Sequence, residues 1–424
     1  MKIKDLFTKG NIHQSFFRIG VILIPSAISI SSFFILISLI IESFKNKNNF
    51  LKDKYNLIFL FVSFLLIISS TIHIFTLKNI FFGKIDPILS WLGLFNWIPF
   101  FWIFWSSQYF LKNLRQREKI SKLLVLGTLP VIFTGIGQYF FEWHGPIKFL
   151  NGFITWYQRP IDSVSGLTGL FNHANYAGSW FTFLLPLSIA LALKRSRMSI
   201  FFKTNLILII FCIFLTNSRN AWASSILTIP VLFGINSFIF LTPILLLLGT
   251  IILITTSNYF TGELQDWFQD VIPNKIWKEF SAEGFTDLNV TRFEIFKAAI
   301  RIIILNPIVG TGGGSFPIIY EMQTGFWKGH SHNIFSDISL SYGIPSMIIL
   351  FFVFLTIICN AYKKIFSKRE ISENIIDRAW ITATIIFLIS QFLDVQYYDA
   401  RISLMFWILL AGIKCISEER QLTY

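Results

Sequence analysis

The amino-acid sequence predicts an all-α, polytopic membrane protein. Hydrophobic residues occupy 54% of its 424 positions, charged residues only 14%, and the mean hydropathy is +0.62. Soluble globular domains are much more polar than this. A transmembrane helix needs about 20 mostly apolar residues, and such runs recur along the chain with short polar gaps. We therefore expect residues 1–424 to form a single integral-membrane domain.

About eleven apolar runs are candidate membrane spans, and we expect about 10–12 transmembrane helices. No convincing cleavage site follows the first run, so we expect it to remain as an anchor. The runs lie at about 19–42, 56–77, 88–111, 123–141, 176–193, 204–217, 220–235, 238–256, 343–361, 379–395 and 402–416.

Three basic segments set the expected orientation of these spans. Residues 112–122, 194–203 and 363–378 are rich in Lys and Arg, and the number of spans between them places all three on one side. Because basic loops stay cytoplasmic, we expect that side to face the cytoplasm. The opposite side, with a large loop at 257–342, then faces the exterior or the periplasm.

The basic segments also explain the net charge of +13 without a nucleic-acid partner, because they fix topology and meet anionic lipid headgroups.

Two basic segments near the N-terminus conflict with the predicted topology. The N-terminal tail and residues 45–54 are both basic, although only the span at 19–42 separates them. Either a further span lies between residues 79 and 111, or one end of the chain breaks the rule.

Polar and ionisable residues gather in four segments on the predicted outer side. Such groups are tolerated near a bilayer mainly where they line a cavity. The segments lie at 159–180, 215–222, 290–316 and 328–335. Together with Asp337 just beyond them, they supply the candidate site residues Arg159, Asn175, Arg219, Arg292, His330, His332 and Asn333.

The third segment predicts a helix that lies in the membrane interface. Asn289 or Thr291 can cap its start, and Pro307 ends it. Lys297 and Arg301 are four residues apart and share one face, while most of the other positions are apolar. This amphipathic pattern is typical of a helix that lies on a membrane and does not cross it.

Arg219 and Arg292 are both expected at the outer surface. A planar guanidinium carries five donors and binds phosphate in a bidentate manner, so the pair can hold a diphosphate at headgroup level. The spacing is equally compatible with each side chain reaching separately to a lipid phosphate.

The glycine run GTGGG at 310–314 does not form a known nucleotide loop. A Walker loop needs GK[ST] after its glycines, and a Rossmann turn needs a strand before it and a helix after it. Glycines do allow a tight turn or a close approach of another segment. We therefore expect this run to end the interfacial helix and to fold close to the membrane.

His330 and His332 have the spacing HxH, which with Asp337 as a third ligand would suggest zinc. No further His, Cys or Glu pattern completes such a site, so we expect neither a metal nor another cofactor. A histidine at an outer membrane surface suits general base chemistry better. Asn333 can orient the ring or a substrate, and Asp337 can orient the histidine or cap the next helix.

The block RFEIFKAAIRIIILNPIVGTGGGSF, followed by HSHNIFSDISLSYGIPS, resembles the signature region of the O-antigen ligase and O-antigen polymerase superfamily. The upstream TNSRNAW and GLFNHANYAG are similar to its other recurrent motifs, in the same order. His332, Asn333 and Gly343 fit the ligase pattern. Ser346 departs from it, because Gly, Thr or Tyr is usual there.

The resemblance implies an integral-membrane glycosyltransferase of C-type architecture in a bacterial inner membrane, with its active site facing the periplasm. Such an enzyme moves a glycan from a polyprenyl diphosphate donor to a hydroxyl of a lipid A core or a growing polysaccharide, without metal or nucleotide. Carried over by position, Arg219 and Arg292 would bind the diphosphate and His332 would be the base. The supporting candidates would be His330, Asn333, Arg159, Asn175 and Asp337.

Two other functions stay open at this stage. A protein O-oligosaccharyltransferase shares these motifs but attaches the glycan to Ser or Thr of a protein. A small-solute transporter is the third possibility. It is less well supported, because transporters carry ionisable residues near the midplane and often have repeated halves, whereas these spans are largely uncharged and show no repeat.

Overall fold

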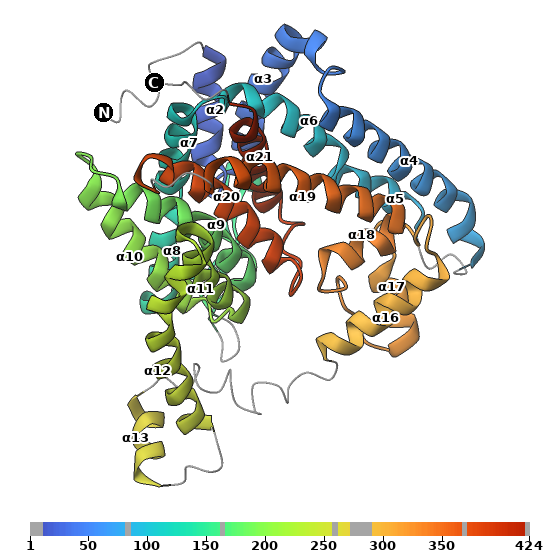
Figure 1. Cartoon of the computed structure of the whole chain (residues 1–424). Coiled ribbons are helices and arrows are strands. Elements are labelled where there is room, and N and C mark those ends of the chain that lie inside the picture. Colours follow the sequence, from blue (N-terminus) through green and yellow to red (C-terminus); the bar gives the residue numbers. More distant parts are fainter. Residues whose placement is uncertain are drawn as a thin grey trace.

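A computed structural model describes residues 12–80, 86–161, 166–256, 262–271, 291–366 and 371–419 of the chain, and these residues are mostly helical (Figure 1). The sheet structure within them is a short antiparallel hairpin of β1 (Ile147–Phe149) and β2 (Ile154–Trp156). The all-α class predicted from the sequence is therefore confirmed.

The helices follow one another along the chain and are joined mostly by short connections. Their bounds are α2 (Ile12–Leu23), α3 (Ile28–Asn46), α4 (Lys54–Ile80), α5 (Ile88–Gly93), α6 (Ile98–Ser107), α7 (Leu114–Gly127), α8 (Leu129–Phe141), α9 (Ala174–Leu193), α10 (Ser199–Leu215), α11 (Arg219–Phe233), α12 (Phe238–Thr256), α13 (Glu263–Val271), α16 (Arg292–Leu305), α17 (Phe316–Thr324), α18 (Ile334–Tyr342), α19 (Ile344–Phe366), α20 (Ile371–Ser390) and α21 (Ala400–Glu418).

Within the described ranges, seven helical segments are long and apolar enough to cross a bilayer, and a bent pair of helices around Pro243 raises the number to eight. The polytopic prediction is confirmed. The expected total of about eleven spans is larger, because it also counted α10, α11 and α20. The first two have 17 and 15 residues, and the start of α20 carries Asp377 and Arg378.

The run predicted as one span at 19–42 is instead a helical hairpin of α2 and α3. Pro25 lies two residues after the end of α2 and prevents its continuation. The two helices then pack closely, because Ser31 Oγ donates a hydrogen bond of 2.8 Å to the Gly20 carbonyl. At the far end of the pair, His13 Nε2 lies 3.1 Å from Glu42 Oε2.

This hairpin removes the topology conflict near the N-terminus. The beginning of α2 and the end of α3 lie at the same end of the pair, so the basic N-terminal segment and residues 45–54 need not lie on opposite sides. The connection between α2 and α3 lies at the other end, where Trp156 Nε1 donates a hydrogen bond of 2.7 Å to the Ser26 carbonyl.

The three basic segments meet at one end of the bundle, which we call the basic end. Arg117 Nε and Nη2 donate to the two carboxylate oxygens of Asp377 at 2.7 and 2.8 Å. Arg117 Nη2 also contacts Glu419 Oε2 at 2.5 Å, and Lys194 Nζ lies 2.5 Å from Glu118 Oε2. These ion pairs join the segments around 112–122, 194–203 and 363–378, as the sequence predicted.

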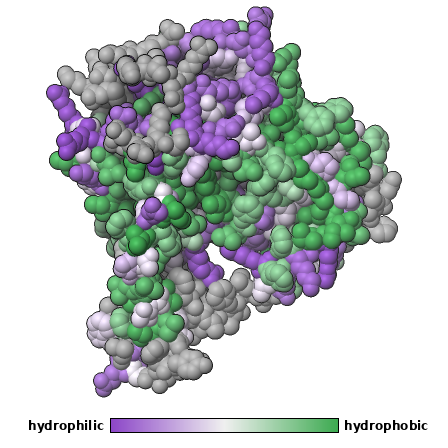
Figure 2. Space-filling view, viewed as in Figure 1, coloured by the Kyte–Doolittle hydropathy of each residue, from purple (hydrophilic) through white to green (hydrophobic). Residues whose placement is uncertain are grey.

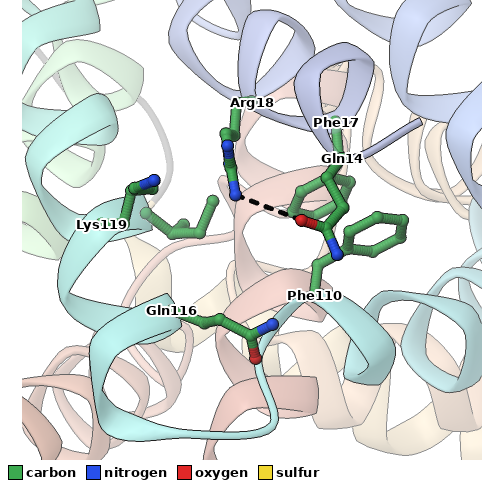
Figure 3. A pocket seen from close by; sticks show the side chains of 7 residues that line it. Gln14, Phe17, Arg18, Phe110, Gln116 and Lys119 are labelled. Carbon is green, nitrogen blue, oxygen red and sulfur yellow. Dashed lines mark hydrogen bonds between the residues drawn. The ribbon is translucent and has the colours of Figure 1, made fainter. Parts of the chain in front are cut away.

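Most of the segment 112–122 is helical and does not form a loop. Asn113 caps α7 by accepting a hydrogen bond of 3.0 Å from the Gln116 backbone N–H. The small pocket between α2 and α7 in Figure 3, where Arg18 donates to Gln14, has a cavity of about 20 Å³. That is room for about one water molecule, so this pocket is not a substrate site.

Apolar side chains form a broad band across the middle of the molecule, and polar side chains gather at the basic end and around α16 and α17 (Figure 2). The centre of the bundle is formed by α9 and α21, whose side chains are buried along almost their whole length. The polar loops at the opposite end of the bundle include the loop before α18 and the loop between α20 and α21. We call this end the site end, because the centre of the bundle is too tightly packed for a polar site.

We predict that Asp377→Asn lowers the free energy of unfolding by about 3 kcal/mol or more, because it removes a partner of the fully buried Arg117 charge. Denaturation of the purified protein in detergent measures the change. The matched control is Lys122→Ala, which breaks an (i, i+4) pair with Glu118. It is expected to cost less than Asp377→Asn, because Glu118 keeps Lys194 as a partner. Equal costs for the two variants would contradict the prediction.

Candidate active site

Two loops meet at the site end of the bundle. One precedes α18, and the other joins α20 to α21. The Ile334 backbone N–H donates a hydrogen bond of 3.0 Å to the Gln391 carbonyl, and Asn333 Nδ2 donates to the Phe392 carbonyl at 3.3 Å. The loops are thus fixed to each other by backbone and side-chain contacts, and they come from segments about 60 residues apart in the chain.

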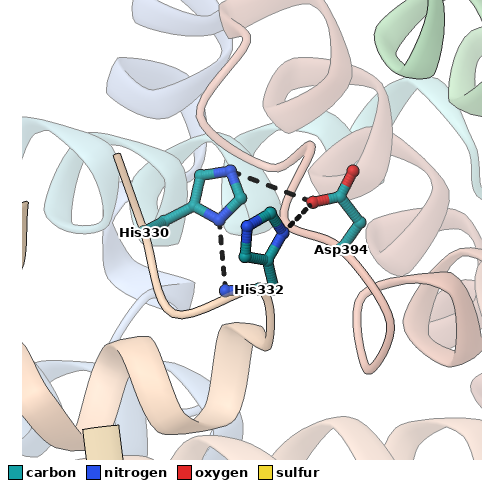
Figure 4. Close-up of side chains that lie close together, drawn as sticks. All are labelled: His330, His332 and Asp394. Atoms are coloured by element: carbon teal, nitrogen blue, oxygen red, sulfur yellow. Dashed lines mark hydrogen bonds and ion pairs between the residues drawn. The ribbon is translucent and has the colours of Figure 1, made fainter. Parts of the chain in front are cut away.

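A cluster of two histidines and one aspartate lies where these loops meet (Figure 4). His332 Nδ1 is 2.8 Å from Asp394 Oδ1. His330 Nε2 is 3.9 Å from the same carboxylate oxygen, and the two imidazole rings have their centroids 4.5 Å apart. The structure thus places a carboxylate beside the histidine that the sequence identified as the base.

The backbone around His332 holds its ring in place. His332 has a φ of +58°, which is an uncommon value for a residue other than glycine. Its backbone N–H donates a hydrogen bond of 3.2 Å to His330 Nδ1. Asn333 follows as the cap of α18 and accepts from the N–H groups of Phe335 and Ser336 at 2.9 and 3.2 Å. A strained residue between two such anchors is typical of a functional site.

Asp394 is itself held on its other side by α9. Its Oδ2 accepts a hydrogen bond of 2.8 Å from Asn175 Nδ2. Asn175 lies in the first turn of α9, where His173 caps the helix by accepting the Asn175 backbone N–H at 3.1 Å. Asn175, one of the supporting candidates from the sequence, therefore orients the Asp394 carboxylate.

The surroundings of Asp394 keep it ionised. Burial by itself would raise the pKa of this carboxyl, but the hydrogen bond from His332 and the favourable electrostatic interactions with the two imidazole rings and the Arg292 guanidinium outweigh burial. The pKa of Asp394 therefore lies well below its ordinary value. A carboxylate only accepts hydrogen bonds, so His332 Nδ1 carries a proton, and in the neutral ring Nε2 keeps its lone pair.

His330 is held neutral in this cluster. Burial of its ring lowers the pKa, and the neighbouring His332 ring and Arg292 guanidinium lower it further, against the opposing effects of Asp394 and Asp337. Its Nδ1 already accepts the His332 N–H, so its proton is on Nε2, which faces Asp394. His330 therefore acts as a support for the His332 backbone.

The same three side chains could also be considered as metal ligands, because their donor atoms lie within 4.8 Å of one another. In a tetrahedral zinc site with bonds of about 2.0 Å, two ligand atoms lie about 3.3 Å apart. His332 Nδ1 and Asp394 Oδ1 are only 2.8 Å apart, which is the length of a charge-assisted hydrogen bond. The geometry fits a shared proton better than a metal ion.

Arg292 is the first residue of α16 and lies close enough to act on the charges of both His330 and Asp394. Thr291 caps this helix in a capping box with Glu294, as one of the two predicted caps. The other, Asn289, is outside the described residues. The helix ends at Leu305, so its predicted extent is confirmed.

Arg219 is the first residue of α11, with Ser218 as its cap. The next residue, Asn220, donates a hydrogen bond of 3.1 Å to the Ser390 carbonyl at the end of α20. Arg219 is therefore at the site end, beside the helix that leads into the Asp394 loop. Arg159 is exposed there too, and its charge acts on His173.

Two supporting candidates have roles other than those expected. Asn333 was expected to orient the ring or a substrate, but its side chain caps α18 and contacts Phe392. Asp337 neither caps that helix nor contacts His332. It accepts a hydrogen bond from the Tyr398 hydroxyl and a longer one from the Ser331 N–H.

The sequence did not predict Asp394 as a site residue, because Asp394 lies in the apolar run predicted as a span at 379–395. The helix α20 ends at Ser390, so Asp394 is in a loop outside it. A carboxylate in so apolar a segment was the available signal, since such groups are usually functional.

The glycines of the GTGGG run permit a close approach, as predicted. Gly310 has a φ of +70°, and a Cβ there would lie 2.4 Å from the Leu340 carbonyl oxygen of α18. The backbone N–H of Thr311 donates to the same carbonyl at 2.6 Å. The run therefore fixes the end of α16 against α18, which carries the histidine loop at its start.

Fold and site together define a polytopic membrane protein with a histidine and carboxylate pair and arginines at one end of the bundle. Residues 204–351, from α10 into α19, match the model of the O-antigen ligase family. This match supports the resemblance to the O-antigen ligase superfamily that the sequence motifs indicated. Its members act on lipid-linked glycans. No curated protein matches the chain.

We predict that the melting temperature falls as the pH is lowered from 7 to 5. The pKa of folded His330 lies below the ordinary value of about 6.5 that it regains on unfolding. The unfolded chain therefore binds more protons in this window, and stability is lost as the pH falls. His330→Gln should reduce the change of melting temperature with pH. His144→Gln, at an exposed histidine, should not reduce it. Equal slopes in all three proteins would contradict this role.

Proposed function

We propose that this protein transfers a glycan from a polyprenyl diphosphate donor to a hydroxyl group of an acceptor, as a ligase or polymerase. The observation that carries the proposal is the 2.8 Å contact of His332 Nδ1 with Asp394, which leaves Nε2 of the ring free to act as a base. The arginines Arg219 and Arg292 lie at the same end of the bundle. They supply the positive charge that a diphosphate requires.

The donor side of the reaction rests on these two arginines. As the glycosidic bond breaks, the lipid diphosphate gains negative charge, and fixed cations beside it lower the barrier. Arg292 and Arg219 each begin a helix, α16 and α11. A helix N-terminus adds backbone N–H donors and a positive partial charge to the guanidinium, which favours phosphate binding. This arrangement supports metal-independent transfer, with two arginines in the place of a divalent ion.

The acceptor side rests on His332. Its Nε2 takes the proton of the acceptor hydroxyl while the hydroxyl oxygen forms a bond to the anomeric carbon of the donor glycan. The bond from that carbon to the diphosphate oxygen breaks, and its electron pair leaves with the lipid diphosphate. Asp394 stabilises the imidazolium that forms and keeps the ring in the required tautomer, as the aspartate does in a catalytic triad.

The exposed residues of α16 support a site at the membrane surface. One face of the helix is buried against α17 and α18. Another exposes a stripe of apolar side chains at helical spacing, which suits contact with lipid as the sequence predicted. We place the site end in the periplasm of a bacterial inner membrane, because the basic end matches the cytoplasmic side. The stripe consists of Phe293, Phe296, Ile300 and Ile304.

We predict that Arg219→Ala, Arg292→Ala and His332→Ala each abolish glycan transfer from a polyprenyl diphosphate donor while membrane insertion stays normal. The assay uses purified protein with a chelator present throughout, because no metal is expected to take part. Asp394→Asn is expected to lower the rate on the order of 100-fold or more, since the ring loses its orienting charge. Its combination with His332→Ala should be no worse than His332→Ala alone.

Arg301→Ala is the matched control for Arg292→Ala, because Arg301 is an exposed arginine further along the same helix. It should retain most of the wild-type rate. Full activity in Arg219→Ala, Arg292→Ala or His332→Ala would remove that residue from the mechanism. Absence of wild-type activity in the chelator, with activity present when the chelator is left out, would favour a metal at the cluster of His330, His332 and Asp394.

The identity of the acceptor distinguishes a ligase, a polymerase and a protein O-oligosaccharyltransferase from one another. Lipopolysaccharide from a deletion strain shows them on a gel: loss of all long chains with accumulated lipid-linked polymer indicates a ligase, and a single repeat on the core indicates a polymerase. A protein O-oligosaccharyltransferase would instead remove glycoprotein staining. Uptake of a solute by reconstituted vesicles would support the transporter alternative.

A further inference from the structure

A cavity of about 200 Å³ lies beside the histidine loop. It is formed by the segment that joins α5 to α6, by the glycine run, by α18 and by the loop before α21. Its lining includes Asn96, Trp97, Asp337, Tyr342 and Tyr398, and also Gly329, which is three residues before His332. The proposed transfer reaction assigns no role to any of these residues except that Gly329 belongs to the histidine loop.

Two glycines create the space in which one of the lining hydroxyls lies. A Cβ on Gly93 would be 2.5 Å from the Tyr342 hydroxyl oxygen, and a Cβ on Gly313 would be 3.0 Å from it. Gly313 belongs to the GTGGG run, so that run also shapes the cavity wall. The two glycines also lie against each other, because a Cβ on either one would be 3.4 Å from the Cα of the other, so the Tyr342 hydroxyl lies where the α5 segment meets the glycine run.

The lining combines polar groups with aromatic rings. Asp337 is only 7% exposed, and its carboxylate accepts from Tyr398 at the cavity wall. Trp97 is 2% exposed and is stacked on Tyr397 with a centroid distance of 4.6 Å. Carboxylate, amide and hydroxyl groups hydrogen-bond to the ring hydroxyls of a sugar, and aromatic faces pack against its C–H groups.

The position of the cavity relative to His332 indicates which substrate it serves. One carboxylate oxygen of Asp394 contacts Asn175, on the side of α9 and α11. The other contacts His332 and His330, on the side of α18. Asp337 lies on that second side and contacts the N–H of Ser331. The cavity is therefore on the α18 side of the histidine and aspartate pair, next to the loop that carries His332, while Arg219 begins α11, which packs against α9.

We infer that this cavity is a subsite for one monosaccharide unit of the acceptor, which it holds beside the base. The inference rests on the proposed function and specifies its acceptor as a glycan. Pockets for drug-sized ligands begin at about 300 Å³, so a cavity of this size takes a single sugar ring and not an oligosaccharide. An acceptor sugar bound in this cavity has one of its hydroxyl groups near the histidine loop.

The direct test is the binding of simple sugars to the full-length protein in detergent. Saturation-transfer NMR measures this binding. The probes are the methyl glycosides of glucose, galactose, N-acetylglucosamine and a heptose. We expect at least one of them to bind wild type and His332→Ala equally. The combined variant Asn96→Ala and Tyr342→Phe, which keeps the fold but removes two polar groups from the lining, should bind it about fivefold more weakly or worse.

Tyr320→Phe is the matched control, because Tyr320 is equally buried but lies in α17 outside this cavity. It should bind the sugar as wild type does. The subsite is overturned if no probe binds wild type, or if the combined variant binds like Tyr320→Phe. Neither result depends on transfer activity, so either can occur while the proposed function stands.

A transfer assay tests the assignment to the acceptor side. The combined variant should raise the KM for the acceptor about fivefold and leave the KM for the lipid-linked donor unchanged. A rise in the donor KM alone would place the cavity on the donor side and overturn the inference. Normal transfer by His332→Ala would instead refute the proposed function while the sugar-binding result stood.

Discussion

The hydrogen bond between His332 Nδ1 and Asp394 Oδ1 is the interaction on which the site depends. It connects the loop before α18 to the loop before α21, and it fixes the tautomer of the ring. Asn175 holds the second oxygen of the same carboxylate, so α9 also takes part. A single buried carboxylate thereby sets the relative positions of three elements that are far apart in sequence.

The rest of the bundle provides the rigidity that this contact needs. Ion pairs at the basic end, centred on the buried Arg117, join α7 to α20 and to the end of α21. The same two helices, α20 and α21, enclose the Asp394 loop at the site end. Charges that fix one end of these helices therefore limit movement of the Asp394 loop at the other end, because packed helices shift as units.

The glycine run is best understood through its neighbours. In a soluble enzyme such a run would invite comparison with a nucleotide loop, but here its backbone packs on α18 through Thr311 and on the Tyr342 hydroxyl through Gly313. The absence of side chains lets α16, α18 and the α5 segment approach one another. The glycine run thus encodes a close packing arrangement that shapes the cavity beside the histidine loop.

Local patterns in the sequence determined the all-α membrane class, the capped helix from Arg292 to Leu305 and the polar segments that supply His332 and the arginines. These follow from hydropathy, capping and helical spacing, which act over a few residues. The tertiary structure alone decided that Asp394 orients His332, that Asn333 caps a helix, and that the first apolar run folds into a hairpin. Each depends on contacts between distant segments, or on where a helix ends, and hydropathy does not encode them.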